Sequence, residues 1–146
     1  MKVIEEKVFN GQPENIKAII KKWWSRHASG YDLVSCSKGV TMLNILFDTE
    51  DSILDYYKQL ENDASITPLL TEGQLIAFIE YTSDSVLNIT SYDGLRAVYV
   101  NFDEFGEVTT EYSDKPLIEL LWDLVPKVIS KSIEHIEYIH DLLFGE

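Results

Sequence analysis

Turn signals recur about every ten residues through the second half of the chain, and this spacing constrains the fold more than any other feature. Ser83-Asp84-Ser85, Asp93-Gly94 and Glu104-Phe105-Gly106 separate runs rich in β-branched and aromatic residues. Asp-Gly is the strongest of these signals, because a tight type I′ hairpin needs two residues that accept a positive φ. Turns at this interval are typical of an antiparallel meander, whereas βαβ units would need a helix between strands. We therefore expect a meander over residues 75–112, with its first strand at 75–82.

An earlier segment also predicts strands, over about residues 31–37 and 40–47, joined by a tight turn at Lys38-Gly39. We expect this hairpin, 31–47, and the meander, 75–112, to form one antiparallel sheet of about five to six strands. Residues 2–9 are compatible with either a short strand or a frayed helical turn. Residues 62–73 contain Pro68 and polar clusters, and they predict a loop.

Apolar residues recur at helical spacing in the remaining segments. They predict an N-terminal helix over about 13–28, a middle helix over about 50–62, and a helix that begins near Pro116. Pro126 is expected to break or kink this third helix near Val125, since proline lacks the amide proton that a helix interior uses. The pattern then resumes to about residue 144, which predicts a second C-terminal helix. The fold class is α+β, with the four helices packed on the sheet in a single domain, 1–146.

The last strand of the meander alternates in polarity. Val108, Thr110 and Tyr112 are predicted to share one face of this strand. Glu107, Thr109 and Glu111 are predicted to share the other. Charge on an edge strand discourages edge-to-edge pairing, so this segment fits an edge with a carboxylate-bearing outer face.

Acidic residues dominate the composition of the 146-residue chain, with 25 Asp and Glu against 12 Lys and Arg and a net charge of −13. The charge is unevenly placed: residues 1–30 carry six basic and three acidic residues, and residues 31–146 carry six and 22. Nucleic acid and anionic lipid bind through Lys and Arg, so direct binding to either is not expected. An acidic surface attracts cationic proteins. The alternative is that the acidity only maintains solubility.

No basic-then-apolar leader is visible at the N-terminus, and the longest apolar run, Leu75-Ile76-Ala77-Phe78-Ile79, is far too short to span a membrane. Cys36 is the only cysteine. A lone thiol in a chain without a secretion signal favours the reducing cytosol. We therefore expect a cytoplasmic protein.

The motifs that would indicate a cofactor or a metal are incomplete. The seven glycines form no phosphate-binding loop. The segment Asn101–Gly106 resembles the start of a calcium loop, but Phe105 stands where an oxygen ligand belongs. Glu137-x-x-His140 has the spacing of a di-iron motif that needs two copies, and it occurs once. No cofactor, metal site or catalytic residue is predicted, although a small enzyme with an unrecognised site at His27, His135 or Cys36 remains an alternative.

Two acidic clusters interleaved with aromatic residues are the strongest functional feature. The first lies within residues 48–63 and the second within residues 101–114, where no basic residue occurs. Aromatic side chains supply desolvated contact area at protein interfaces, and acids on the rim steer and select a basic partner. The predicted partner-binding residues of the two clusters are Asp48, Asp51, Asp55, Tyr56, Asp103, Glu104, Phe105, Glu107 and Glu111.

Trp23 and Trp24 are adjacent on the N-terminal helix, about 100° apart. One of them must therefore point away from the apolar stripe. Trp24 is a candidate partner anchor, because tryptophan is over-represented at interface hot spots. The alternative, which we favour, is that Trp24 packs inside the protein.

In size, acidity and layout the whole chain is similar to bacterial immunity proteins, small acidic cytosolic α+β proteins that bind and neutralise a toxin domain. No diagnostic motif accompanies this resemblance. It implies an immunity or antitoxin-type inhibitor of a basic partner, such as a nuclease toxin. A second hypothesis is a regulatory or scaffolding domain, for example a phage-encoded one, that binds through its helices.

Overall fold

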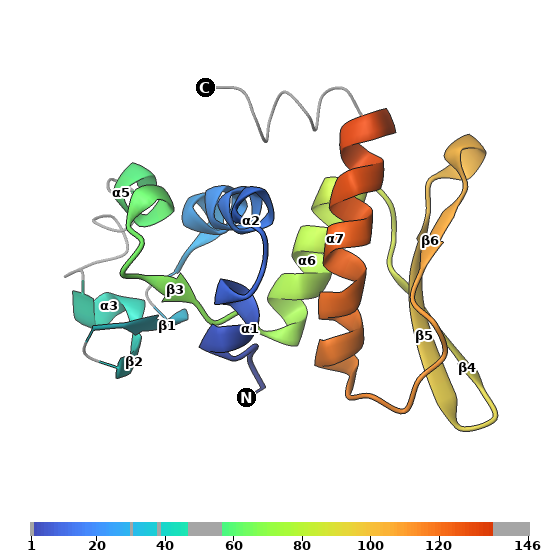
Figure 1. Ribbon diagram of the computed structural model, residues 1–146, viewed down its shortest axis with the longest axis horizontal. Coiled ribbons are helices and arrows are strands. Elements are labelled where there is room, and N and C mark those ends of the chain that lie inside the picture. Colours follow the sequence, from blue (N-terminus) through green and yellow to red (C-terminus); the bar gives the residue numbers. More distant parts are fainter. Residues whose placement is uncertain (1, 30, 38, 47–56, 136–146) are drawn as a thin grey trace. The chain divides into compact units, whose positions relative to one another are not determined.

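The computed structural model describes residues 2–29, 31–37, 39–46 and 57–135. The chain divides into two compact units: an N-terminal unit, Val3–Leu70, and a C-terminal unit formed by Thr71–Glu146 with the first two residues. Each unit contains its own three-stranded antiparallel sheet (Figure 1). The α+β class is confirmed. The single sheet of five to six strands is not found, because the hairpin takes its third strand from residues 67–68 and residues 75–82 are helical.

Four helices belong to the described part of the N-terminal unit: α1 (Glu6–Asn10), α2 (Glu14–His27), α3 (Leu43–Leu46) and α5 (Tyr57–Asn62). The predicted N-terminal helix is confirmed as α2, which begins after Pro13 and buries Ile16 and Ile20. Residues 2–9 contain the start of α1, preceded by a bridge in which the amide of Ile4 donates to the carbonyl of Leu70 at 3.0 Å. Of the predicted middle helix, 50–62, only α5 lies within the described residues.

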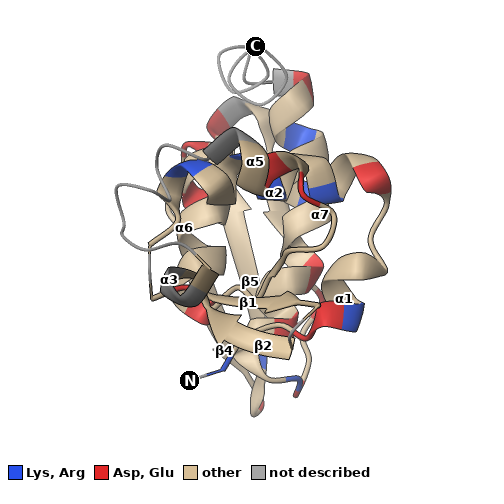
Figure 2. Cartoon of the chain, turned by 90° about the vertical axis from the view of Figure 1, so that its left-hand side faces the viewer, with Lys and Arg blue, Asp and Glu red and all other residues tan. Residues whose placement is uncertain are grey.

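The sheet of the N-terminal unit has the order β2–β1–β3, formed by Gly39–Met42, Leu33–Cys36 and Thr67–Pro68. The predicted strand over 40–47 is therefore wrong over Leu43–Leu46, which forms α3, and residue 47 lies outside the described residues. The predicted loop over 62–73 contains β3, whose Thr67 pairs with Ser35. Strands β1 and β2 carry no charged side chain, and the charges of this unit lie on other segments (Figure 2).

The predicted first strand of the meander, 75–82, is wrong: this segment belongs to α6 (Glu72–Ser83). The helix begins at a capping box, in which the Thr71 hydroxyl accepts from the amide of Gln74 and the Gln74 side chain accepts from the amide of Thr71. Leu75, Phe78 and Ile79 are fully buried at helical spacing. Short apolar runs fit strand and helix equally well, and here the cap marks the helix.

The C-terminal helix α7 runs without interruption over Leu117–His135, so the predicted break near Val125 is not found and the two predicted C-terminal helices form one helix as far as His135. The rest of the segment predicted to be helical to about residue 144 lies outside the described residues. Pro126 lies inside the helix, where it removes one backbone hydrogen bond. Leu121, Leu124 and Val128 on the same helix are fully buried. Burial of these side chains offsets the cost of the missing bond.

Three strands form the sheet of the C-terminal unit in the order β4–β5–β6: Asn88–Tyr92, Leu95–Asn101 and Glu107–Thr109. The predicted Asp93-Gly94 hairpin is confirmed, with φ values of 51° and 77° that fit a type I′ turn. A short 3-10 helix, η1 (Asp103–Phe105), connects β5 to β6. Helix α7 packs on α6, β5 and β6. Both helices lie on one side of this sheet (Figure 1).

None of the helices in the described ranges has the length and apolar character needed to cross a lipid bilayer.

Candidate functional site

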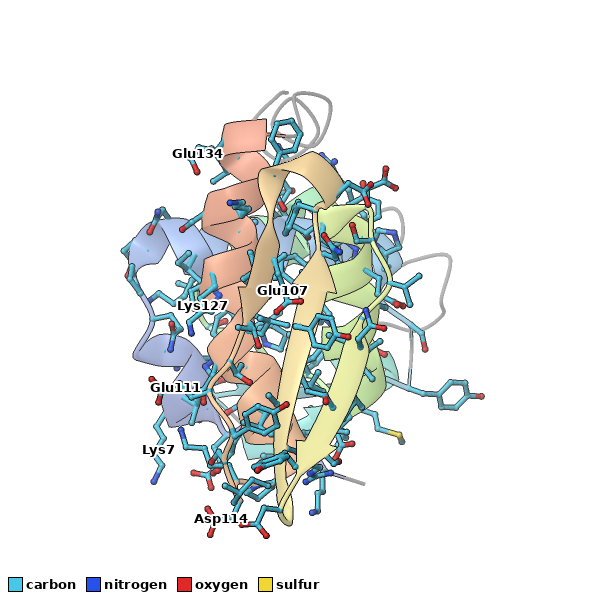
Figure 3. All side chains as sticks on the ribbon, turned by 90° about the vertical axis from the view of Figure 1, so that its right-hand side faces the viewer. Lys7, Glu107, Glu111, Asp114, Lys127 and Glu134 are labelled. Carbon is cyan, nitrogen blue, oxygen red and sulfur yellow. The ribbon has the colours of Figure 1, made fainter. Side chains whose placement is uncertain are left out.

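One face of the β4–β5–β6 sheet is covered and the other is open. Val98 and Val100 of β5 point to the covered face, next to α7, and are fully buried. Within the C-terminal unit, α6 and α7 both lie on the covered side, and the other face of the sheet is turned toward the viewer in Figure 3. Antiparallel sheets commonly bury one face and leave the other in solvent. Side chains on the open face are therefore available to a partner.

Strand register determines which side chains the open face carries. Tyr92 pairs with Leu95, and Tyr99 pairs with Thr109. Paired residues lie on the same side of a sheet, and successive residues alternate. Because Val98 and Val100 face α7, these four residues face away from it. We call the open side the tyrosine face, defined by Tyr92, Leu95, Tyr99 and Tyr112.

Tyr112 reaches this face because the chain after β6 holds one extra residue. Val100 pairs with Val108 in the regular ladder, and the amide of Thr110 still donates to the carbonyl of Val98. The next bridge joins Arg96 to Ser113 instead of residue 112. This one-residue shift is a β-bulge, and it reverses the alternation beyond Thr110. The prediction that Tyr112 shares a face with Val108 and Thr110 is therefore wrong.

The rings of Tyr92 and Tyr112 meet edge to face, with centroids 6.2 Å apart and planes at 65°. The Tyr112 hydroxyl also lies 3.4 Å from the hydroxyl of Thr90. Tyr92 remains 72% exposed, Tyr112 47% and Leu95 37%. Two large aromatic rings thus support one another while much of their area stays in contact with solvent. Exposed apolar groups that gather in this way are typical of interaction surfaces.

Carboxylates surround the tyrosine face. Glu107 lies on the face itself, opposite Asn101. Asp93 is in the β4–β5 turn at one end of the sheet, and Asp103 is in η1 at the other. Figure 3 shows Glu107, Glu111 and Asp114 following one another along the β6 side. All five side chains are exposed. We call these five residues the acidic rim.

The structure brings one of the two predicted clusters together. Asp103, Glu107 and Glu111 belong to the acidic rim, and Phe105, 41% exposed, lies in η1. Glu104 follows Asp103 in η1, and its side chain is outside the described set. The other predicted residues, Asp48, Asp51, Asp55 and Tyr56, also lie outside the described residues. Sequence reasoning missed Tyr92, Leu95 and Tyr99, although the aromatic residues that flank Asp93-Gly94 were a signal for them.

Trp24 is not available as a partner anchor. Its side chain is 1% exposed, and its indole nitrogen donates to Oδ2 of Asp32 at 3.1 Å. Trp23 is also buried, at 7% exposure, and stacks on the ring of His27. Both tryptophans therefore pack inside, and the assignment of Trp24 to a partner surface is corrected.

The residues considered for an enzyme do not belong to the tyrosine face. Nδ1 of His27 is 2.8 Å from the carbonyl of Trp23, within its own helix. Sγ of Cys36 is 3.5 Å from the carbonyl of Gly39, across a strand turn. The side chain of His135 is outside the described set. Within the described ranges, no three side chains from His, Cys, Asp and Glu are grouped so that they could hold a metal ion.

Comparisons of the chain with protein-family models, with curated proteins and with solved structures give no match.

Proposed function

We propose that this chain is a binding protein of the immunity or antitoxin type, which captures a basic partner protein on its tyrosine face and blocks it. The observation that carries the proposal is the exposed Tyr92–Tyr112 pair on an open sheet face, surrounded by the acidic rim.

The tyrosine face has the chemistry of an interface centre. Tyrosine is enriched at protein interfaces, where it buries a large area and loses little side-chain entropy. Tyr92 and Tyr112 are already held against one another, so little further ordering is needed on binding. Leu95 adds aliphatic area beside them, since it pairs with Tyr92 across the hairpin.

The acidic rim determines the charge of the partner. Residues 97–114 contain five acidic residues and no lysine or arginine. The one basic residue between Asp84 and Asp114, Arg96, is half-buried and points to the covered side, where its guanidinium donates to the carbonyl of Lys115. A surface of one sign speeds capture of a partner of the opposite sign, most strongly at low salt. It also disfavours acidic competitors.

The inhibitor would block its partner by occupying the surface on which the partner binds its substrate. A nuclease binds its substrate through Lys and Arg that neutralise phosphates. A carboxylate-rimmed surface fits the same cationic groups and competes for them. The inhibitor therefore needs no catalytic residue of its own, only a complementary surface.

The test begins with capture of a partner by the tagged chain, followed by binding kinetics on the purified pair. Four variants are compared with the wild type: Tyr92→Ala, Tyr112→Ala, the double charge reversal Glu107→Lys/Glu111→Lys, and the matched reversal Glu119→Lys/Glu134→Lys. The last pair lies on α7 and is exposed, so it changes net charge equally away from the tyrosine face.

We expect a basic partner whose association rate falls roughly tenfold or more with the rim reversal at low salt and much less with the α7 reversal. The two tyrosine substitutions should mainly speed dissociation. Co-production of the chain should suppress the partner's activity in cells. A partner that binds all variants equally, or one whose activity is unchanged by the chain, would contradict the proposal.

The alternative is a regulatory domain that binds through its helices, and Trp24 is not available to such a surface because it is buried. The same set of variants addresses it. Binding that is lost only with the α7 reversal would favour the helices over the tyrosine face.

A further inference from the structure

A pocket of about 230 Å³ lies within the N-terminal unit, and none of its lining residues belongs to the tyrosine face. Its walls come from α1, α2, α5 and the residues before and within β3. The charged residues that line it are Glu14, Lys17, Lys21 and Glu61. A single water molecule needs about 10–15 Å³ of such a volume, so the pocket has space for several waters. This is room for a small molecule.

Lys21 is the unusual group in this pocket. The residue is only 8% exposed, and its ammonium donates one hydrogen bond, to the main-chain carbonyl of Asp63. None of the ion pairs formed between described residues includes Lys21. Burial lowers the pKa of Lys21, the charge of Asp63 raises it, and that of Lys17 lowers it. A carbonyl satisfies one of three ammonium donors, so the buried charge is incompletely compensated.

Lys17 lies one turn earlier on the same face of α2 and lines the same pocket. Its side chain is 20% exposed, and Nζ is 2.7 Å from Oε1 of Glu14. The Glu14 side chain is 92% exposed, so water screens this pair from one side. The ammonium groups of Lys17 and Lys21 therefore both lie at this pocket. Lys21 is the more buried of the two, and among the described residues it has no carboxylate within ion-pairing distance.

The balance of charge limits what the pocket can hold. Glu14 and Glu61 line the pocket together with the two lysines, and the charge of Asp63 also acts on Lys21. A ligand with several negative charges, such as a polyphosphate, would therefore meet net repulsion. The remaining walls include the apolar side chains of Phe9, Ala18 and Ile66. A ligand with one negative group and a short apolar body matches both features.

We propose that this pocket binds a small monocarboxylate, whose oxygens accept from Lys21 and Lys17 and whose apolar part lies against Phe9 and Ile66. The carboxylate supplies the negative charge that Lys21 lacks. The apolar part gains free energy from burial, so affinity should increase with alkyl length until the pocket is full.

The test is a titration of the isotopically labelled full chain with sodium acetate, butyrate and phosphate, at ionic strength held constant with chloride. Chemical shifts of backbone amides report the site. We expect saturable shifts at Lys17, Ala18, Lys21 and Asn62, with butyrate binding several-fold more tightly than acetate and phosphate binding weakest. Shifts that do not saturate, or that spread evenly over the chain, would overturn the proposal. Tighter binding of phosphate than of butyrate would also overturn it.

Substitutions of single lysines then test which ammonium group binds the carboxylate. Lys21→Met keeps the length of the side chain and removes the ammonium, and it should reduce butyrate affinity at least tenfold. Lys7→Met is the matched control: Lys7 is in the same unit, is 83% exposed, and lies outside the pocket lining. Lys17→Met tests the second donor and keeps the proposal testable if Lys21→Met does not fold. Equal butyrate affinity in Lys17→Met and Lys7→Met would exclude the role of Lys17 and contradict the proposal.

Discussion

Tyr92 and Tyr112 meet across the open face of the C-terminal sheet, although 19 residues separate them in sequence, because a β-bulge turns Tyr112 toward the strand that carries Tyr92. Regular alternation would place the two rings on opposite faces. The proposed binding surface therefore depends on one extra residue between Thr110 and Ser113.

This contact predicts a coupling energy. Tyr92→Leu and Tyr112→Leu should each reduce stability, and the double variant should lose less than the sum, by about 0.5–1.5 kcal/mol for an aromatic pair and nearer the lower value at exposed positions. Urea unfolding of the four proteins measures the coupling. Strict additivity would show that the two rings do not interact in solution.

The capping box at Thr71 predicts that the start of α6 is sensitive to one hydroxyl. Thr71→Ala removes the acceptor for the Gln74 amide and should lower the free energy of unfolding by about 1 kcal/mol. Thr71→Ser retains the hydroxyl and is the control, and little or no loss is expected because serine ranks at least as high as threonine at this cap position. Equal losses in the two variants, measured by chemical denaturation, would argue against the cap.

The two glycines Gly94 and Gly73 predict opposite responses to alanine. Gly94 has φ +77° with open space where a Cβ would lie, so Gly94→Ala should cost about 1–2 kcal/mol through backbone strain alone. Gly73 lies in the first turn of α6, where the nearest neighbour to an added Cβ is the Thr71 hydroxyl at 3.8 Å. Gly73→Ala should therefore stabilise by about 0.5–1 kcal/mol, since alanine costs less entropy in a helix. Thermal unfolding of both variants checks the two signs.

The buried ammonium of Lys21 predicts a pH dependence. In the folded chain the pKa of Lys21 lies below 10.5, the ordinary value that applies to the unfolded chain. At a pH between the two pKa values, the unfolded chain therefore binds more protons than the folded chain. The free energy of unfolding should therefore rise with pH through that interval, and below it the full cost of the buried charge remains. Lys17, Glu14, Glu61 and Asp63 are the other charged groups around Lys21.

The measurement is the difference in unfolding free energy between the wild type and Lys21→Met as pH increases toward 10.5. Subtraction removes the titration of groups that the two proteins share. We expect the difference to move in favour of the wild type as the ammonium loses its proton. A difference that stays constant over this range would show that Lys21 titrates alike in both states.

Some elements could be predicted from local sequence patterns, because residues close together in the chain are enough to specify them. The stripe of Ile16 and Ile20 predicts α2, because helical period and burial agree over 14 residues. Asp93-Gly94 predicts the β4–β5 hairpin, because few residue pairs adopt two positive φ values cheaply. The acidic residues of 101–114 could be assigned to one cluster from sequence alone, since a single turn and two strands hold them together.

The remaining elements were decided by tertiary structure. Their local sequence pattern fits two different structures, and contacts with distant residues select one of them. The apolar run Leu75–Ile79 fits strand or helix, and packing of α6 on α7 buries the helix that the capping box at Thr71 begins. Pro126 stays within α7 because burial of its neighbours outweighs one lost hydrogen bond. Trp24 is buried, and its indole N–H is satisfied there by the carboxylate of Asp32. The position of Tyr112 follows from the pairing of Arg96 with Ser113. The alternation of residues within one strand does not reveal such a pairing between strands.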